Sequence, residues 1–309
     1  MKGVRVDVAP VPLSVGRRSS QVVADYLALT KPRLNSLVVV TSAGGYCLGA
    51  SRPQTFLPMA AVAVGTALVA GGAAVLNQVY ERETDALMER TRLRPLPDQR
   101  VTPEEARTFG TLLAAGGIVL LSVSANVLAA LLALATLVVY LAIYTPMKRR
   151  SSLATLIGAV PGALPPLIGW TAASGSLSLG GWSLFAIVFL WQIPHFMAIA
   201  WLYRDDYARA GFPMLPVVEP DGRRTGLQAV FYAAALVPVS IAPTVVGLTG
   251  AAYFWTAVVL GVGLLWIAAR FALSRTDATA RVLFYSSITY LPLIWTAMLL
   301  DHFWLTHVS

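Results

Sequence analysis

The sequence has little charge for its length of 309 residues. Asp, Glu, Lys and Arg together make up 12% of it, whereas 57% of the residues are hydrophobic and the mean hydropathy is +0.68. Soluble domains carry about 25% charged residues, so this chain has too little polar surface to cover a fold in water. The same composition excludes a disordered chain and a collagen-like repeat. It predicts an all-α polytopic protein whose helices span a lipid bilayer.

Cysteine is almost absent too, since Cys47 is the only one. A single cysteine forms no internal disulfide and no multi-cysteine metal or iron–sulfur site. Cys47 is interpreted as a small apolar residue of a helix. The formal net charge of +8 would suggest nucleic acid binding in a soluble protein. Here the placement of the charges matters more than their sum, and we expect no nucleic acid partner.

A helix needs roughly 20 apolar residues to cross about 30 Å of hydrocarbon, and nine segments are apolar over close to that length. Several contain runs of Gly, Ala and Ser, which allow helices to approach closely within lipid. The boundary near residues 124–126 is the softest. The nine predicted spans are about 35–50, 56–80, 108–124, 127–145, 153–173, 182–202, 226–248, 251–269 and 283–300.

The N-terminal segment differs from the spans. Residues 1–20 hold basic residues but no apolar run of signal-peptide length, so we expect a flexible cytoplasmic tail and no cleaved signal. Residues 21–33 are interpreted as an amphipathic interfacial segment that ends where Pro32 interrupts it. Residues 21–309 are expected to form a single membrane domain.

The positive charges predict the orientation. Nine spans place the two termini on opposite sides of the membrane, and we place the N-terminus in the cytoplasm. With that choice 22 of the 23 Lys and Arg residues fall on the cytoplasmic side, and only Arg52 does not. A miscounted span would have mixed the two sides, so the positive-inside rule supports this topology, in a cell (inner) membrane. The predicted cytoplasmic segments are 1–34, 81–107, 146–152, 203–225 and 270–282.

The acidic residues follow the same division, although orientation does not require it. Fourteen of the fifteen lie on the predicted cytoplasmic side, and only Asp301 does not. The opposite loops are short and nearly uncharged. Any chemistry is therefore expected at the cytoplasmic face.

The first polar cluster follows the second span. Asn77, Glu81 and Asp85 are spaced i, i+4, i+8, which places three oxygen-bearing side chains on one helix face. Such ligands suit Mg²⁺, which proteins commonly hold with one or two carboxylates and substrate phosphates. Arg90 and Arg94 follow, with forked donors that fit phosphate oxygens. The alternative is a solvated helix end with i, i+4 ion pairs.

The second cluster lies in and after the sixth span. His195 follows Pro194 inside an apolar segment, with Gln192 nearby. A histidine on a helix is often a satisfied core residue, and its intramembrane position makes a functional role an equal alternative. Asp205 and Asp206 come about two turns after His195 and are candidates to close a metal site that Glu81 and Asp85 open. His302 and His307 lie near the other face and are interpreted as incidental.

The third cluster begins with Lys148, Arg149 and Arg150 at the inside edge of the fifth span. Positive-inside anchoring alone would explain these three residues. The span that follows them, 153–173, holds three glycines and three prolines and is expected to be kinked or partly unwound. Breaks of this kind are tolerated where the backbone groups that lose their helical hydrogen bonds are buried in protein or line a cavity.

These segments together resemble the UbiA-type intramembrane prenyltransferase superfamily, and within it the branch that acts on heme. The resemblance runs from LTKPR (Leu29–Arg33) through Pro216, and the nine-span plan extends it to the end of the chain. Its most specific motif is N-x₃-E-x₃-D-x₂-M-x-R-T-x₂-R-P-L, from Asn77 to Leu96. WQ-x-PHF (Trp191–Phe196) and DY-x₂-AG-x-PMLP (Asp206–Pro216) separate the heme branch from the quinone and chlorophyll branches.

The resemblance implies a bundle of nine helices around a central cavity open to the cytoplasmic face. It also implies transfer of a farnesyl group from farnesyl diphosphate to a vinyl group of protoheme IX, with addition of water, giving heme O and diphosphate. Heme A synthase or oxidase assembly factors are implied as possible partners. The implied residues are Asn77, Glu81, Asp85 and Asp206 for catalysis; Glu81, Asp85, Asp205 and Asp206 for Mg²⁺; Arg90, Arg94, Lys148 and Arg149 for diphosphate; and His195 for heme.

Two positions depart from the superfamily pattern. Its first motif usually has Asp in the middle, where this chain has Glu81, which keeps the carboxylate with a longer reach. Its second motif usually has two Asp residues four apart, but Leu202 and Ala210 stand four positions before and after Asp206. The second motif is therefore expected to supply fewer carboxylates.

Two other functions stay open. A prenyltransferase of the same superfamily that acts on an aromatic acid or quinone precursor would share the diphosphate site but have no use for a heme ligand. A transporter or heme carrier without chemistry would show scattered intramembrane charges or inverted repeats. The confinement of charge to one face disfavours the transporter.

Overall fold

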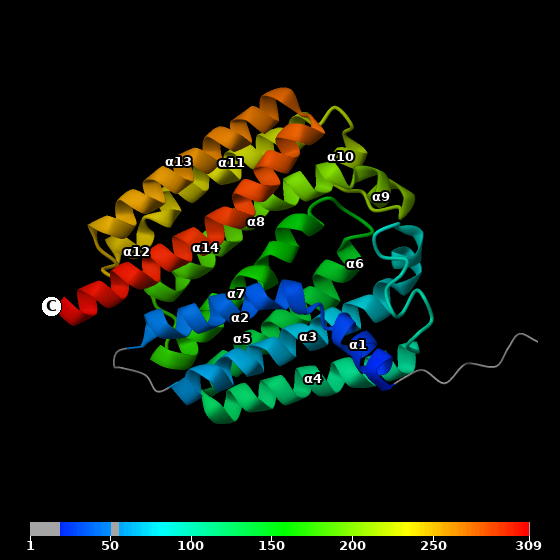
Figure 1. Ribbon diagram of the computed structural model, residues 1–309, viewed down its shortest axis with the longest axis horizontal. Helices are drawn as coiled ribbons and strands as arrows, with labels where there is room; N and C mark the ends of the chain where they lie inside the picture. Colours follow the sequence, from blue (N-terminus) through cyan, green and yellow to red (C-terminus); the bar gives the residue numbers. More distant parts are fainter. Residues whose placement is uncertain (1–18, 51–55, 309) are drawn as a thin grey trace, which may run out of the picture.

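The computed structural model describes residues 19–50 and 56–308, and over these ranges it contains helices and no strands. The predicted all-α fold is confirmed. Figure 1 shows long helices lying side by side, with the short helices α1, α9 and α10 at one end. The elements are α1 (Ser19–Leu29), α2 (Pro32–Gly49), α3 (Phe56–Leu87), α4 (Pro103–Ser124), α5 (Val127–Val138), the π-helix η1 (Val139–Tyr144), α6 (Thr145–Met147), α7 (Ala154–Ser174), α8 (Leu179–Leu202), α9 (Arg204–Arg209), α10 (Leu215–Val218), α11 (Arg223–Ser240), α12 (Ala242–Val245), α13 (Ala251–Ser274) and α14 (Asp277–Val308).

Eight helical segments in the described ranges are long and apolar enough to cross a membrane, as a multi-pass protein requires. They correspond to the second through ninth predicted spans. The first predicted span, 35–50, forms α2, which is not among the eight because polar residues such as Arg33 and Asn35 dilute its first turns. The count of nine crossings therefore stays a prediction.

The N-terminal segment differs in detail from the expectation. The predicted tail 1–20 lies outside the described residues except for Ser19 and Ser20, which begin α1. Helix α1 ends at Leu29, so this segment ends three residues before Pro32 and not at Pro32 as expected. Pro32 instead begins α2, because its fixed φ suits the first helical position. Lys31, just before it, has a left-handed φ of 50°.

Helices α2 and α7 pack with their backbones in close approach. A Cβ at Gly49 would lie 2.9 Å from the carbonyl oxygen of Trp170, and one at Gly169 would overlap that of Ser42. Small residues allow such contact in membrane helices. α7 is one continuous helix with three internal prolines, so the expected partial unwinding of 153–173 is not observed. Its small residues serve packing against α2 instead.

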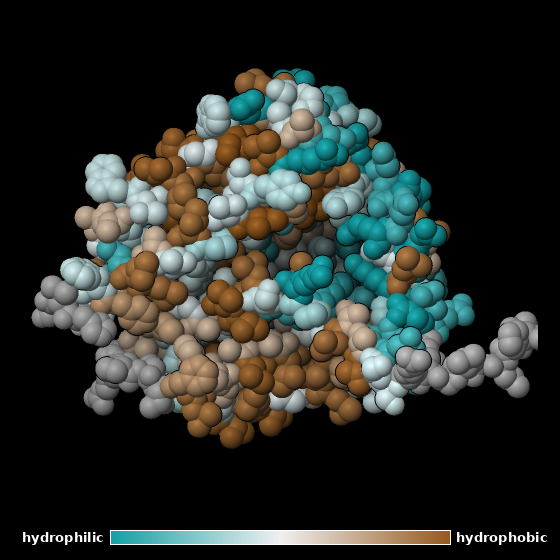
Figure 2. Space-filling model, viewed as in Figure 1, coloured by the Kyte–Doolittle hydropathy of each residue, from teal (hydrophilic) through white to brown (hydrophobic). Residues whose placement is uncertain are grey.

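The polar residues gather at one end of the bundle. Figure 2 shows hydrophilic residues concentrated at the end that carries α9, α10 and the loop after α3, while the body is mainly hydrophobic. A hollow opens beside this end, between α2 and α14. The last turns of α3 and the residues after η1 lead into the same end, which is where the candidate site lies.

Candidate active site

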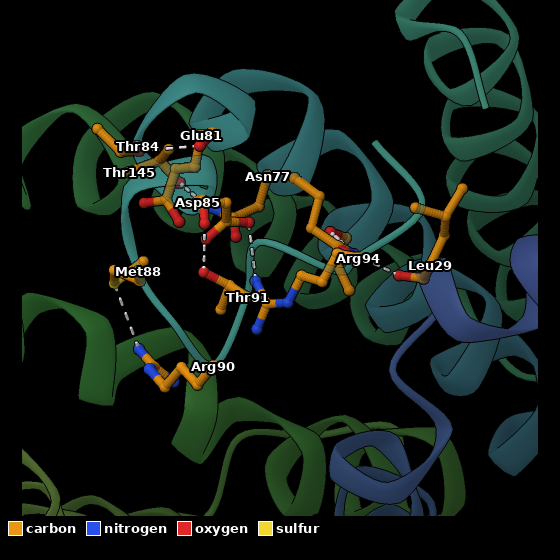
Figure 3. Close-up of polar contacts among 12 residues, drawn as sticks. Leu29, Asn77, Glu81, Thr84, Asp85, Met88, Arg90, Thr91, Arg94 and Thr145 are labelled. Carbon is orange, nitrogen blue, oxygen red and sulfur yellow. Dashed lines mark hydrogen bonds and ion pairs between the residues drawn. The ribbon is translucent and has the colours of Figure 1, made fainter. Parts of the chain in front are cut away.

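The three oxygen-bearing side chains of the first motif lie on one face of α3. Asn77, Glu81 and Asp85 are buried, with exposed fractions of 2%, 4% and 1%. Figure 3 shows them in succession along the helix, facing the loop that carries Arg90 and Arg94. Buried carboxylates are costly unless charged or polar groups compensate them. The surroundings of each therefore decide what the site can bind.

The amide of Asn77 is oriented by Thr145. Nδ2 of Asn77 lies 3.1 Å from Oγ1 of Thr145, and that hydroxyl donates to the carbonyl oxygen of Tyr140 at 2.7 Å. The acceptor is five residues back, in the π-helical turn η1. Since a hydroxyl has one hydrogen, Oγ1 accepts from Asn77. The amide oxygen of Asn77 is thereby left for a ligand.

The carboxylate of Glu81 is paired with Lys148. Nζ of Lys148 lies 2.9 and 3.0 Å from its two oxygens, and it also sits 4.9 Å from the ring centre of Phe212. Burial alone would lower the pKa of Lys148, but Tyr144 and Glu81 outweigh burial and raise it. Lys148 is therefore a permanent cation in the site. The two partners are 67 residues apart in the sequence.

The loop after α3 supplies the partner of Asp85. Nη1 of Arg94 lies 2.8 Å from Oδ2 of Asp85, and the Thr91 hydroxyl donates to the Asp85 carbonyl oxygen at 2.6 Å. Arg90 donates to the Tyr207 hydroxyl at 3.2 Å and lies over the rings of Tyr203 and Tyr207. The motif from Asn77 to Leu96 thus folds back on itself, and α9 covers it.

The remaining predicted residues are placed differently. Asp206 is buried, but it accepts from the backbone N–H of Glu89 at 3.4 Å and pairs with Arg209. Asp205 and Arg149 are exposed. Among the described residues no three His, Cys, Asp or Glu side chains gather as a metal site. A role of Asp205 and Asp206 as Mg²⁺ ligands beside Glu81 and Asp85 therefore stays a prediction.

Lys31 is a site residue that the motif analysis did not single out. It is within electrostatic reach of Arg94, Lys148, Glu81 and Asp85, and burial followed by the two positive charges lowers its pKa to about 7. It lies at the junction between α1 and α2, where Gln78 donates to the Leu29 carbonyl oxygen at 2.6 Å and holds α1 against α3. The sequence feature that could have indicated Lys31 is a basic residue directly before a proline that begins a helix.

His195 lies apart from the charged residues, within α8. Its ring stacks on Trp191 and Phe284, with centroids 5.4 and 5.1 Å away. Nδ1 lies 2.9 Å from the Ser287 hydroxyl on α14. The amide of Gln192, three residues before His195 in the sequence, donates to the Ala159 and Val188 carbonyls. The structure therefore contains a charged site and a separate aromatic histidine site.

Oxygen donors, nearby cations and an apolar helical bundle define an intramembrane enzyme that handles an anionic substrate. The chain matches the model of the UbiA prenyltransferase family over residues 37–295. It is 48% identical over 286 residues to a protoheme IX farnesyltransferase of Solibacter usitatus (strain Ellin6076), covering 90% of this chain and 98% of the relative. It is 46% identical over 283 residues to that of Opitutus terrae (strain DSM 11246 / JCM 15787 / PB90-1), covering 91% and 96%.

Solved structures have the same fold. A digeranylgeranylglyceryl phosphate synthase superimposes with a TM-score of 0.77 at 18% identity, covering 91% of this chain and 99% of that one. A UbiA homologue from Archaeoglobus fulgidus, bound to GPP and Mg²⁺, superimposes with a TM-score of 0.64 at 15% identity, covering 89% and 99%. The chain belongs to the UbiA prenyltransferase family and is a prenyltransferase.

Proposed function

We propose that the protein transfers a farnesyl group from farnesyl diphosphate to a vinyl group of protoheme IX, with addition of water, giving heme O and diphosphate. The observation that carries the proposal is the buried site in which Glu81 and Asp85 face Lys148 and Arg94. One heme-branch motif, Asp206–Pro216, adjoins this site through Tyr207 and Phe212, and the other, Trp191–Phe196, holds the separate histidine. The relatives of the chain are named protoheme IX farnesyltransferases.

The basic residues are proposed to bind the diphosphate. Lys148 and Arg94 contact the carboxylates of α3, Arg90 lies beside Met88 just after that helix, and Lys31 is within electrostatic reach of the same carboxylates. Arginine forks match phosphate oxygens, and fixed cations stabilise the charge that develops on a leaving diphosphate. Arg149 is assigned a peripheral role in attracting the anion, because it is exposed.

Mg²⁺ fits the donors of α3. The amide oxygen of Asn77 and the carboxylates of Glu81 and Asp85 are hard oxygen ligands on one helix face, which Mg²⁺ prefers together with substrate phosphates. When bound, Mg²⁺ would neutralise charge on the diphosphate. The Archaeoglobus fulgidus homologue was solved with GPP and Mg²⁺, which supports the assignment. Asp206 is proposed to hold the covering loop, through its contact with the Glu89 N–H.

The reaction exchanges the bond to diphosphate for a carbon–carbon bond to heme. The allylic C–O bond breaks and its electron pair leaves with diphosphate, while the terminal vinyl carbon of heme forms a bond to the farnesyl carbon. Water then adds to the inner carbon cation and loses a proton, which leaves a hydroxyl group. An apolar cavity protects the cation from early attack by water. Trp191 and Trp170, both buried, are proposed to contribute to that shielding.

The cellular setting is also a proposal. Residues 21–309 form one membrane domain in a cell inner membrane, with the hydrophilic end of Figure 2 toward the cytoplasm. The one-sided distribution of Lys and Arg supports this orientation. A heme A synthase or an oxidase assembly factor would receive the product.

The decisive experiment is mass analysis of heme extracted from membranes that express this chain in cells lacking their own heme O. A heme heavier by a farnesyl group plus water is expected. The Asp85→Ala variant should lose the product, and Glu83→Ala, an exposed carboxylate on the same helix, should keep it. Unmodified protoheme with the protein inserted would instead favour an aromatic or quinone acceptor, which farnesyl diphosphate turnover against such acceptors would test.

A further inference from the structure

The surroundings of His195 differ from those of a histidine that merely fills a core. The ring is nearly parallel to the rings of both Trp191 and Phe284, at interplanar angles of 16° and 19°. The side chain is only partly buried. The other two histidines of the chain, His302 and His307, belong to the last turns of α14, at the opposite end of the bundle from α9 and α10.

The hydrogen bonds of Ser287 determine which nitrogen of His195 carries the proton. The Ser287 hydroxyl lies 2.7 Å from the Phe284 carbonyl oxygen, to which only a donor can bond, and 2.9 Å from Nδ1 of His195. A hydroxyl has one hydrogen, which is used on the carbonyl, so it must accept from Nδ1–H. The backbone carbonyl of Ser287 accepts from the Trp191 indole at 2.7 Å and fixes this turn of α14 against α8.

The other nitrogen is left with an unused lone pair. Nε2 of His195 has no hydrogen-bond partner in the described chain, and it is not among the enclosed polar atoms that lack one. A histidine of the packed interior would use both nitrogens or be enclosed by apolar groups. A neutral imidazole that is anchored through Nδ1–H and open at Nε2 is the arrangement of a metal-ligating histidine.

We propose that Nε2 of His195 is the axial ligand of the heme iron and that Ser287 is the residue that positions it. This assignment rests on the proposed function, because the heme is its acceptor substrate. His195 lies seven residues before Leu202, the end of α8, which places it about 10 Å below the polar end. Iron bound there lies inside the apolar bundle, and the Trp191 and Phe284 rings, nearly parallel to the imidazole, hold the plane of the His195 ring.

The test measures ligation independently of turnover. The full-length protein in detergent is titrated with hemin, reduced, and examined by resonance Raman spectroscopy for the iron–histidine stretch. The unaltered chain is expected to show this band, with a shift when its histidines carry ¹⁵N. His195→Ala should lose the band, and added imidazole should restore it. Ser287→Ala should shift the band and weaken heme affinity by about 10-fold or more, as does the loss of a hydrogen-bond partner that orients a metal ligand.

Two controls separate positioning from packing. Ser287→Thr keeps the hydroxyl and should keep the band. Ser183→Ala removes another buried serine of the bundle, on α8, whose hydroxyl bonds only to the Gly180 carbonyl among the described residues, and it should change nothing. A Ser287→Ala band identical to that of the unaltered chain would overturn the positioning role.

The remaining outcomes distinguish this assignment from the proposed function. Absence of the iron–histidine band in the unaltered chain, with heme O still formed in cells, overturns the ligand assignment and leaves the function standing. The band without any heme O product overturns the function and leaves a heme-binding site. An unchanged band in His195→Ala shows that another group binds iron, which also overturns the assignment.

Discussion

At the scale of single residues, each buried carboxylate of α3 is matched by one cation. Glu81 faces Lys148, and Asp85 faces Arg94, with separations of 2.9 and 2.8 Å. A buried ion pair adds little net stability, but removal of one partner leaves an uncompensated charge. The pairing thereby holds Lys148 and Arg94 in place beside the oxygen ligands of α3.

This pairing predicts the effect of Lys148→Ala on stability. The variant leaves the Glu81 carboxylate buried without its partner, so the free energy of unfolding should fall by about 3–5 kcal/mol. The double variant Glu81→Gln/Lys148→Ala should recover most of that loss, since it leaves no unpaired charge at these two positions. Chemical unfolding in detergent measures both. Equal losses in the single and double variants would contradict the compensation argument.

Lys31 predicts a pH dependence of substrate capture. Its pKa of about 7 means that it is charged below pH 7 and neutral above it in the free enzyme. The charged and titratable groups within its electrostatic reach are Arg94, Lys148, Glu81 and Asp85. If Lys31 binds diphosphate, kcat/KM for farnesyl diphosphate should fall as the pH rises through about 7, because kcat/KM reports groups of the free enzyme.

The control for that profile is Lys31→Arg, which stays charged throughout the accessible range. Its kcat/KM should lose the decline above pH 7 while kcat keeps its own profile. The same residue affects stability in the opposite sense. Since the folded state releases the Lys31 proton before the unfolded state does, its contribution to the free energy of unfolding should increase from about pH 7 toward the usual lysine pKa. A decline that persists in Lys31→Arg would assign it to another group.

At the scale of elements, the close approach of α2 and α7 predicts which glycines are structural. Gly169→Ala would place a Cβ against the Ser42 carbonyl oxygen, where backbone must shift, and should lower the free energy of unfolding by about 1–3 kcal/mol or more. Gly116→Ala and Gly263→Ala are matched controls, since nothing lies within 4 Å of their added Cβ atoms. Because alanine favours the helix more than glycine does, these two substitutions should leave the free energy of unfolding unchanged or raise it slightly. Thermal unfolding in detergent compares the three.

The elements also show what the sequence could predict and what it could not. Hydrophobic runs and helical spacing predicted the long helices and the shared face of Asn77, Glu81 and Asp85, because both depend on local periodicity. The Lys148 partner of Glu81 depends on tertiary packing, and the π-helical turn that allows Thr145 to orient Asn77 leaves no periodic pattern. Whether Asp205 joins the oxygen ligands of α3 also depends on tertiary packing, since sequence spacing does not say which way a short helix turns.

At the scale of the whole molecule, the charge distribution and the packing of α2 both bear on whether α2 crosses the membrane. α2 begins beside Lys31, within electrostatic reach of the charged site, and its last turn packs against Trp170 of the membrane-crossing helix α7. A helix of 18 residues reaches about 27 Å at 1.5 Å per residue, close to the hydrocarbon thickness. The hydropathy of α2 is low, but one face of the helix is buried in protein and need not contact lipid. We therefore expect α2 to cross the membrane.

Nine crossings place Gln21 and Ser176 on opposite sides, which single cysteines can test in a Cys47→Ala background. Gln21 and Glu104 are exposed at the polar end, and Ser176 is exposed in the α7–α8 turn. A membrane-impermeant thiol reagent added to intact cells should label Ser176→Cys and spare Gln21→Cys and Glu104→Cys. Permeabilised cells should label all three, which verifies access. Labelling of Gln21→Cys in intact cells would mean that α2 does not cross, because eight crossings put α1 on the side of Ser176.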